Sequence, residues 1–581
     1  MANLPEFPPA LLFIAGALLV ALTPSASTRR AFTCTIPLVS AFYIGMGLHT
    51  DTTVSIPFLT YELSPLRVDR LSYVFGGIFS LVAFIGSIYA WTNADRKQQV
   101  ASLLYTAGAV GVTFAGDYIV LYVFWELMAV SSVFLIWARK ESDSQRAGNR
   151  YLLLHLTGGA ILLAGIAGHT SATGSIAFEA IVPPSDTWGA WVILMGFCLN
   201  AAVPPLGAWL PDAYPKATVT GAVFCSALTT KTAVYTLLRA FPGWDILVVA
   251  GVAMALYGVV YAVLADDIRE LLAYHIISQV GYMVAGVGIG TPLALNGATA
   301  HAICHILYKA LLFMGTGAVL HTTGRSKLSE LGGFLSRQKL TFSLYMIGAF
   351  SISGFPLWSG FVSKSMVVSA AGEAHLDGVF LLLTLASIGT FLHTGLKLPY
   401  FTWMGPDRGI RPTSVPASMH AAMAITAALC TTIGIMPGIL YQFLPEASNY
   451  HPYTSAHIIE SIQMLLFTFF AFYLLIPHLG SYPTVLMDTD VIYRKASPWA
   501  KRTFVDCPAE LFDSVQGCLS RVTGAATQAL RNPTLWFRIN PLNPPQPFDP
   551  DRERKPLQTL LTAILIVFVW VAILSVSTWS N

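Results

Sequence analysis

Five charged side chains lie deep within long apolar stretches of this sequence: Glu126, Lys231, Lys309, Lys364 and Lys397. An ionised group at the bilayer centre costs about 2.5–3.5 kcal/mol on insertion scales, so such residues mark ion or proton pathways. A lysine also loses its proton readily once it is desolvated. We therefore expect these five residues to carry protons or other cations through the middle of the molecule.

Two histidines accompany the central lysine. His301, His305 and Lys309 follow one another at intervals of four residues, which places them on one helical face about 6 Å apart. Histidine titrates near neutral pH, so this ladder can pass protons along water. A metal site and histidines bonded to neighbouring backbone are the alternatives. No carboxylate or cysteine lies on that face to complete a metal site.

The single carboxylate, Glu126, requires a basic partner because a buried unpaired charge is costly. Lys231 is the nearest basic residue in the sequence, and we expect the two to form an ion pair. The pair could open and close during transport, or it could only hold two helices together.

Lys364 and Lys397 lie toward the ends of their apolar segments, so an extension of their side chains to the membrane surface is the alternative to a transport role. His155 and His393 are weaker candidates, because histidines in such segments often serve packing. Asp117 falls between two segments and is expected at the surface.

The composition sets the fold class. Hydrophobic residues make up 55% of the chain and charged residues 11%, and the mean hydropathy is +0.62. Most apolar segments reach the roughly 20 residues that a helix needs to cross a bilayer, where only helices and closed barrels satisfy the backbone. We predict an all-α polytopic membrane protein with about sixteen transmembrane helices. They span 8–23, 30–48, 70–91, 100–116, 117–138, 150–170, 190–210, 217–238, 244–264, 271–289, 296–320, 340–365, 378–402, 414–440, 458–478 and 557–577.

The seventh and twelfth of these segments, 190–210 and 340–365, contain proline and glycine at mid-membrane. A proline inside a helix removes a backbone hydrogen bond and breaks or kinks the helix. Paired broken helices in corresponding places indicate an internal repeat with a transport site at the breaks. Because the two lie five segments apart, the second copy is predicted to be inverted.

Basic residues are sorted between the two sides. Before the C-terminal tail, the loops after odd-numbered segments hold sixteen arginines and lysines, and those after even-numbered segments hold three. Basic loops face the cytoplasm, so we predict that both termini lie outside.

Redox and nucleotide chemistry have no candidate site in the sequence. The seven cysteines show no metal-binding spacing, and no Walker loop, dinucleotide fingerprint or iron–sulfur pattern is present. We therefore predict no cofactor, no metal and no nucleic-acid partner.

Several motifs resemble the antiporter-like subunit family shared by Mrp-type multisubunit Na⁺/H⁺ antiporters and the membrane arm of respiratory complex I. The resemblance covers about residues 65–445 and is nearest to the D-type Mrp subunit. It rests on Phe124 to Met128, Trp209 to Ala213, Thr230 to Tyr235, Asp267 to Tyr274, Gln279 to Met283, His301 to Phe313 and Ser359 to Lys364.

This resemblance implies two inverted five-helix repeats around a buried hydrated axis. It assigns Glu126 to the ion-pair carboxylate, Lys309 to the central proton carrier beside His301 and His305, and Lys364 to the exit. Many relatives have a lysine where this chain has Asn200. We expect Lys231 to take over that role.

The tail differs from that of a minimal D-type subunit. Asp506-Cys-Pro-Ala-Glu reads as a helix start, followed by apolar residues at helical spacing, namely Leu511, Phe512, Val515, Cys518, Leu519, Val522 and Leu530. An amphipathic helix of about 25 residues is expected to lie along the membrane or a partner subunit.

The expected organisation has six parts. They are N-terminal spans (1–95), a first repeat (96–240), a second, inverted repeat (241–405), two further spans (406–480), a cytoplasmic-side amphipathic segment (481–556) and an anchor helix (557–581).

The principal functional hypothesis is a subunit that moves H⁺ and Na⁺ or K⁺ in a multisubunit antiporter, with other integral membrane subunits and the lipid bilayer as partners. The alternatives are a proton-pumping subunit of a complex I-like NADH dehydrogenase or membrane-bound hydrogenase, a proton-coupled inorganic-carbon uptake complex, and a structural scaffold.

Overall fold

The computed structural model describes residues 6–93, 95–183, 185, 187–447, 449–479, 488–489 and 502–531, with single positions at 491, 495, 499, 562, 564, 566 and 567. The chain divides into two compact units, residues 1–490 and 491–581.

The first unit is built from helices, short 3-10 and π-helical turns, and one β-hairpin. In chain order its elements are α1 Ala10–Leu22, α2 Ala26–Gly47, β1 Thr53–Phe58, β2 Tyr61–Arg67, α3 Arg70–Tyr89, α4 Arg96–Phe114, α5 Tyr118–Trp137, α6 Ser142–Thr173, α7 Trp188–Asn200, α8 Trp209–Ala213, η1 Tyr214–Lys216, α9 Gly221–Ala227, α10 Thr229–Ala240, α11 Asp245–Leu264, α12 Ile268–Ile289, α13 Pro292–Thr323, η2 Leu335–Arg337, α14 Lys339–Ser353, α15 Ser359–Glu373, α16 Asp377–Thr390, η3 Phe391–Lys397, η4 Tyr400–Met404, α17 Ala417–Ile435, α18 Gly438–Tyr441 and α19 Ser455–Leu475.

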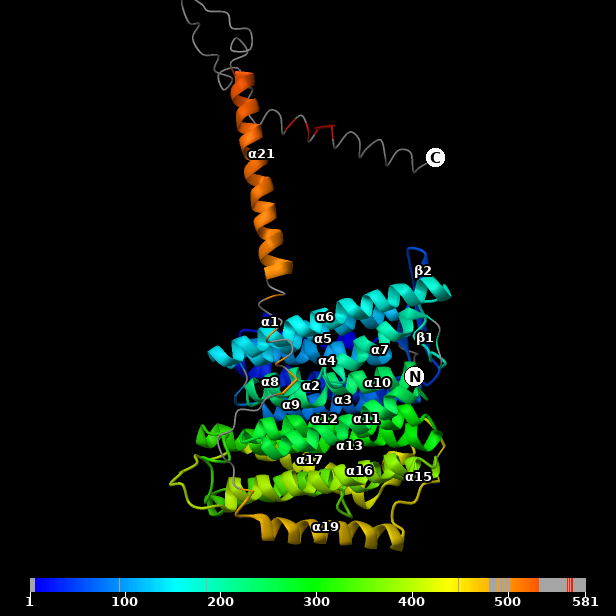
Figure 1. Ribbon diagram of the computed structural model, residues 1–581, viewed down its shortest axis with the longest axis vertical. Helices are drawn as coiled ribbons and strands as arrows, with labels where there is room; N and C mark the ends of the chain where they lie inside the picture. The colour runs from blue at the N-terminus through cyan, green and yellow to red at the C-terminus, as the bar shows by residue number, and fades with distance from the viewer. Residues whose placement is uncertain are drawn as a thin grey trace, which may run out of the picture. The chain divides into compact units, whose positions relative to one another are not determined.

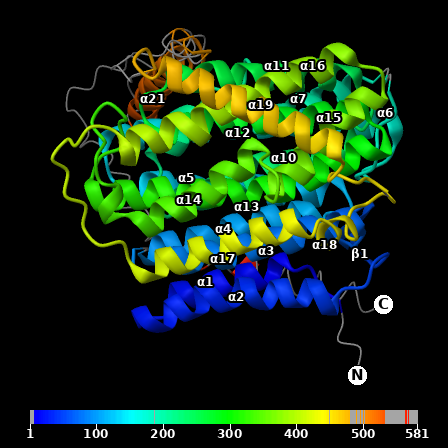
Figure 2. The ribbon, with the colours of Figure 1, turned by 90° about the horizontal axis from the view of Figure 1, so that it is seen from below.

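Helix α13 lies at the centre of this unit. Its neighbours run alongside it in roughly parallel directions (Figures 1 and 2), and it packs against α3, α9, α10, α12, α14, α15 and α17. Of its most apolar window, 94% is buried. A helix that is apolar all round and enclosed by others belongs in the core, so its polar side chains are shielded from lipid.

Nine described helical segments are long and apolar enough to cross a membrane: Arg70–Tyr89, Tyr118–Trp137, Ser142–Thr173, Asp245–Leu264, Ile268–Ile289, Pro292–Thr323, Asp377–Met404, Ala417–Ile435 and Ser455–Leu475. Every predicted span up to 458–478 coincides with one helix or one interrupted helix. The last predicted span, 557–577, lies almost wholly outside the described residues. The all-α class is confirmed, whereas the number of sixteen crossings stays a prediction.

The predicted breaks are present in the structure. Helix α7 ends at Asn200 and the chain resumes helical structure at Trp209, and α14 ends at Ser353 before α15 begins at Ser359. The sequence did not predict a third interruption, at Leu228 between α9 and α10, or the π-helical turns after α16.

Landmarks of the first helices recur 150 positions later in the chain. Helix α6 runs from residue 142 to 173 and α13 from 292 to 323, and both have 32 residues. Isolated β-bridges join 117 to 177 and 267 to 327. The two halves therefore share a local plan, and His155 on α6 corresponds to His305 on α13.

The expected surface position of Asp117 is wrong. Asp117 is buried and caps α5, where its carboxylate accepts hydrogen bonds from the backbone N–H groups of Ile119 and Val120. Ser64 of strand β2 donates a third backbone bond, at 2.6 Å. The sequence analysis did not anticipate this β-hairpin, which covers the start of α5 and supplies the donor that keeps the buried carboxylate satisfied.

The two halves are joined by Arg269 at the start of α12. Its buried guanidinium donates hydrogen bonds to the carbonyls of Tyr214, Ala217 and Thr218, at 3.3, 3.0 and 3.2 Å. These carbonyls belong to the connection between α8 and α9. One side chain therefore bonds to three backbone carbonyls of the first half from a helix of the second.

The second unit contains the tail helix α21, Cys507–Arg531, preceded by the π-helical turn η5, Arg502–Asp506 (Figure 1). The predicted amphipathic helix of about 25 residues is confirmed. Its apolar side chains Leu511, Phe512, Val515, Leu519, Val522 and Leu530 are exposed within the described structure. Its contact with a membrane or partner stays a prediction.

Candidate functional site

The four candidate lysines are all enclosed by protein. Lys231 on α10 and Lys309 on α13 are 0% exposed, and Lys364 on α15 and Lys397 in η3 are 4% exposed. The structure therefore contradicts the alternative in which Lys364 and Lys397 extend to the membrane surface.

Three of these ammonium groups dock on carbonyls at helix C-termini. Lys231 Nζ donates to Ser226 O at 2.5 Å, near the end of α9. Lys364 Nζ donates to Ile352 O at 2.8 Å, near the end of α14, and Lys397 Nζ donates to Val263 O at 2.7 Å, near the end of α11.

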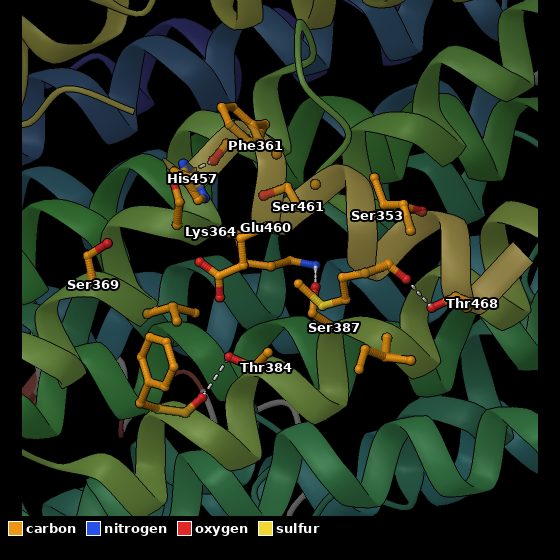
Figure 3. Close-up of a pocket in the computed structure, with 18 residues that line it drawn as sticks. Ser353, Phe361, Lys364, Ser369, Thr384, Ser387, His457, Glu460, Ser461 and Thr468 are labelled. Carbon is orange, nitrogen blue, oxygen red and sulfur yellow. Dashed lines mark hydrogen bonds between the residues drawn. The ribbon is translucent and has the colours of Figure 1, made fainter. Parts of the chain in front are cut away.

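Terminal carbonyls lack partners within their own helix and form the negative end of its dipole. These helix ends thus supply the partial negative charge that a carboxylate would supply elsewhere. Lys364 also donates a hydrogen bond to Ser387 Oγ at 3.2 Å (Figure 3). Its Nζ atom lies 5.3 Å from the centroid of the Tyr282 ring.

Lys309 differs from the other three lysines. Its Nζ has no hydrogen-bond partner among the described residues, and neither ring nitrogen of His305 has one. Buried polar groups are normally satisfied by protein or ordered water. This stretch of α13 therefore has donors and acceptors that are free to bind water.

The N-terminal member of the ladder, His301, is hydrogen-bonded on both ring nitrogens. His301 Nδ1 lies 3.1 Å from Ser363 Oγ on α15, and its Nε2 lies 3.4 Å from the hydroxyl of Tyr308. Tyr308 in turn donates to Gln279 Oε1 at 3.4 Å. Because Ser363 precedes Lys364 in the chain, this contact brings the ladder next to the second broken helix.

The expected ion pair between Glu126 and Lys231 is absent from the described part of the chain. Helix α5, which carries Glu126, packs on α4, α6 and α9, whereas α10, which carries Lys231, packs mainly on α4, α7, α12 and α13. Lys231 interacts electrostatically with Lys309 and His305 instead. Nearness in sequence did not give the order in which the helices pack.

Glu126 faces α6. A Cβ atom added at Gly159 would collide with the Glu126 carboxylate, so the absence of a side chain at Gly159 makes the room that this group occupies. Gly159 corresponds to Lys309 in the 150-residue register. The Oε1 atom of Glu126 is buried without a hydrogen-bond partner in the described structure.

Asn200 lies at the end of α7, beside the first break. Both polar atoms of its amide are buried without hydrogen-bond partners among the described residues, and His155 lies beside it. The His155 ring packs on Tyr151 and Trp209, with centroids 4.1 and 4.5 Å away. The first half thus has a polar cluster without a lysine.

Sequence reasoning missed His275 on α12. This buried ring lies 5.6 Å from that of His393, centroid to centroid, and interacts electrostatically with Lys309 and Lys364. His393 interacts in the same way with Lys397. A histidine inside the apolar segment 271–289 is the signal that could have identified it.

Glu460 on α19 was also overlooked, because it stands close to the start of the apolar segment 458–478. It lines a cavity together with Lys364. Among the described residues, no group of three or more histidine, cysteine, aspartate or glutamate side chains could hold a metal ion.

The chain is similar in sequence to known membrane proteins. The family model described as "NADH:quinone oxidoreductase/Mrp antiporter, TM" matches residues 115–392. An uncharacterized protein of Methanocaldococcus jannaschii is 29% identical over 440 residues, which cover 70% of this chain and 89% of the relative.

Two relatives have informative names. The D-type subunit of the Na⁺/H⁺ antiporter of Alkalihalophilus pseudofirmus is 29% identical over 403 residues, which cover 64% of this chain and 81% of the relative. The L-type subunit of the NADH-quinone oxidoreductase of Mycobacterium tuberculosis is 30% identical over 391 residues, covering 62% of this chain and 61% of the relative.

Solved structures share the fold. A chain of the Mrp complex from a Dietzia species superposes with a TM-score of 0.65 at 21% identity, covering 79% of this chain and 97% of the other. A chain of respiratory complex I from Thermus thermophilus gives a TM-score of 0.65 at 20% identity, with 76% and 99% covered. These structures are multisubunit membrane complexes. The chain is a multi-pass integral membrane protein, and its residues 115–392 are similar to the membrane subunits that Mrp antiporters and NADH:quinone oxidoreductases share.

Proposed function

We propose that this chain is the proton- and monovalent-cation-translocating subunit of a multisubunit Mrp-type cation/proton antiporter. The observation that carries the proposal is the row of buried basic side chains at the centre of the molecule. It runs from Lys231 on α10 past Lys309, His305 and His301 on α13 to Lys364 on α15. The similarity to a D-type antiporter subunit supports it.

Repulsion between neighbouring ammonium groups would move the protons. Lys231 interacts electrostatically with Lys309, and His275 interacts with Lys309 and Lys364. A like charge nearby disfavours the protonated form of a base. A proton that arrives on one member therefore favours release from the next, without an ion pair that opens and closes. Lys397, beside His393, would be a side branch of this row.

The domain organisation belongs to the same proposal. Residues 96–240 and 241–405 would be two inverted repeats, each with five spans and one broken helix. The 150-residue recurrence of α6 in α13 and of both β-bridges supports a repeat. The loop charges support its orientation in a bacterial or archaeal plasma membrane, with both termini outside.

The packing predicts that Glu126 and Lys231 act independently. Glu126→Gln and Lys231→Met should each change the free energy of unfolding of the purified complex, measured by thermal melting. In the double variant the two changes should add to within about 0.5 kcal/mol. A direct ion pair would instead give coupling of about 0.5–3 kcal/mol. Coupling in that range would restore the ion pair and refute the separation described above.

A second candidate is a proton-pumping subunit of a complex I-like assembly. The specific observation in its favour is the 30% identity to an L-type subunit of an NADH-quinone oxidoreductase. The same row of bases would then carry protons while the redox chemistry takes place in partner subunits.

Purification of the intact complex separates the two candidates. Small integral membrane subunits and a pH gradient that drives Na⁺ or K⁺ uptake in proteoliposomes are expected for the antiporter. Copurifying iron–sulfur and flavin subunits, with no cation exchange, would replace it with the complex I-like assembly.

A further inference from the structure

A cavity of about 110 Å³ lies between α15, α16 and α19. One water requires about 10–15 Å³ measured in this way, so the cavity has room for several. Polar side chains stand among apolar ones in its lining. The polar side chains include Ser365 and Lys364 from α15, Thr384 and Ser387 from α16, and His457, Glu460, Ser461 and Thr468 from α19 (Figure 3).

Helix α19 turns its polar residues toward this cavity. His457, Glu460, Ser461 and Thr468 recur at helical spacing on the lining face, whereas Phe467, Phe470, Tyr473 and Leu474 are exposed elsewhere on the helix. Ionisable residues in a membrane span are rare and mark pathways. The side chains of Lys364 and Glu460 line one cavity without an ion pair between them in the described structure.

The groups around Lys364 leave the cavity as the route by which a proton on its ammonium group can leave. On the inner side, His301 is held by Ser363, and the Tyr282 ring of α12 lies over the ammonium group. Helix α16 contributes the neutral Ser387 and Thr384. On the cavity side, His457 is fixed by its Nδ1 contact with Pro452 O at 2.7 Å and by stacking on Phe361. Among the residues that line the cavity, Glu460 is the carboxylate.

The cavity lies toward one end of the bundle. Ser369, later in α15, bonds to Tyr450 at 3.2 Å, and Asn296 in the first turns of α13 bonds to Glu446 O at 2.8 Å. The described residues between α18 and α19, 442–447 and 449–454, therefore lie at this end. The charge pattern of the loops assigns these residues to the outside.

We propose that Glu460 exchanges protons with Lys364 through water in this cavity, and so forms the outer end of the proton path. The Lys364 ammonium releases a proton and becomes a neutral amine, while the Glu460 carboxylate accepts the proton and becomes a carboxylic acid. Glu460 then releases the proton to the outside water, and Lys364 is reprotonated from the His301 side. This inference rests on the proposed function.

The test compares proton transport by four versions of the purified complex in proteoliposomes. Glu460→Gln should slow transport at least about tenfold, as expected for the loss of a proton-transfer group, and Glu460→Asp should stay within twofold of the parent. Glu373→Gln is the matched control, because Glu373 is exposed at the end of α15 and does not line the cavity. It should also stay within twofold.

If Glu460→Gln transports normally, Glu460 has no role in proton exchange, whereas loss of transport in Lys309→Met would show that the proposed function still holds. If the parent complex moves no protons at all, the proposed function itself fails.

Thiol labelling tests the cavity even if Glu460→Gln does not assemble. In a background with Cys507→Ser and Cys518→Ser, Ser365→Cys should react with a charged, membrane-impermeant reagent added from the outer side. Ser363→Cys on the same helix faces His301 and should not react. Protection of Ser365→Cys, or reaction from the inner side only, would overturn the outer water-filled path.

Discussion

Replacing Lys309 with methionine is expected to reduce coupled transport at least about 100-fold, the scale at which a positioned proton-transfer group contributes. Lys309 sits at the centre of the row, between Lys231 and the His301 end, and it is 0% exposed. Methionine has a similar length but cannot bind a proton, so the row would be interrupted with little change in packing.

The same substitution should leave the protein at least as stable as the parent. The Lys309 ammonium has no hydrogen-bond partner among the described residues, and a buried charge without a partner costs several kcal/mol. Thermal melting of the purified complex should therefore show an unchanged or higher midpoint. Loss of activity without loss of stability identifies a residue kept for function.

Lys339→Met is the control for this experiment. It removes an exposed lysine at the start of α14 and should change neither transport nor melting. Coupled transport by Lys309→Met above one tenth of the parent rate would remove Lys309 from the path. A marked fall in its melting temperature would give Lys309 a structural role instead.

Replacing Arg269 with methionine is expected to lower both the yield and the melting temperature of the assembled protein. Three carbonyls would lose the guanidinium as a donor, and the Ala217 carbonyl would be left with no donor among the described residues, whereas Tyr214 O and Thr218 O still accept from backbone N–H groups. Each unsatisfied buried group costs about 1–3 kcal/mol, and whole domains are stable by only about 5–15 kcal/mol. The complex should be recovered at low yield and should melt many degrees below the parent.

Arg269→Lys should be intermediate, because an ammonium group reaches fewer of these carbonyls than the planar guanidinium does. Arg325→Met, which removes an exposed arginine in a loop of the same half, should be close to the parent in yield and melting. An Arg269→Met complex that melts within about 2 °C of the parent would show that the three hydrogen bonds contribute little to joining the halves.

Sequence patterns predicted the features that follow from local chemistry. The breaks after Asn200 and Ser353 were predictable because proline and glycine stand where an apolar helix should continue. The ladder on α13 was predictable because helical periodicity places residues four apart on one face. The interruption at Leu228 gave no such signal, since the helices on both sides meet there without proline or glycine.

Features that depend on which helices pack together could not be predicted in this way. The sequence could not show that α10 lies against α13 and that Glu126 instead faces Gly159 on α6. It also could not show that Lys397 would find a carbonyl partner, because Val263 lies on a different helix, 134 positions earlier in the chain. His275 and Glu460 are candidates only because the fold places them near the buried lysines.

The docking of three lysines on helix ends has an electrical consequence. A carbonyl carries no net charge, so a lysine that gains or loses a proton there changes the total charge inside the bilayer by a full unit. Each such charge that moves across the membrane is worth about 2.3 kcal/mol per 100 mV. The occupancy of these sites should therefore follow the membrane voltage, and a cell's resting potential would bias the direction in which the protein runs.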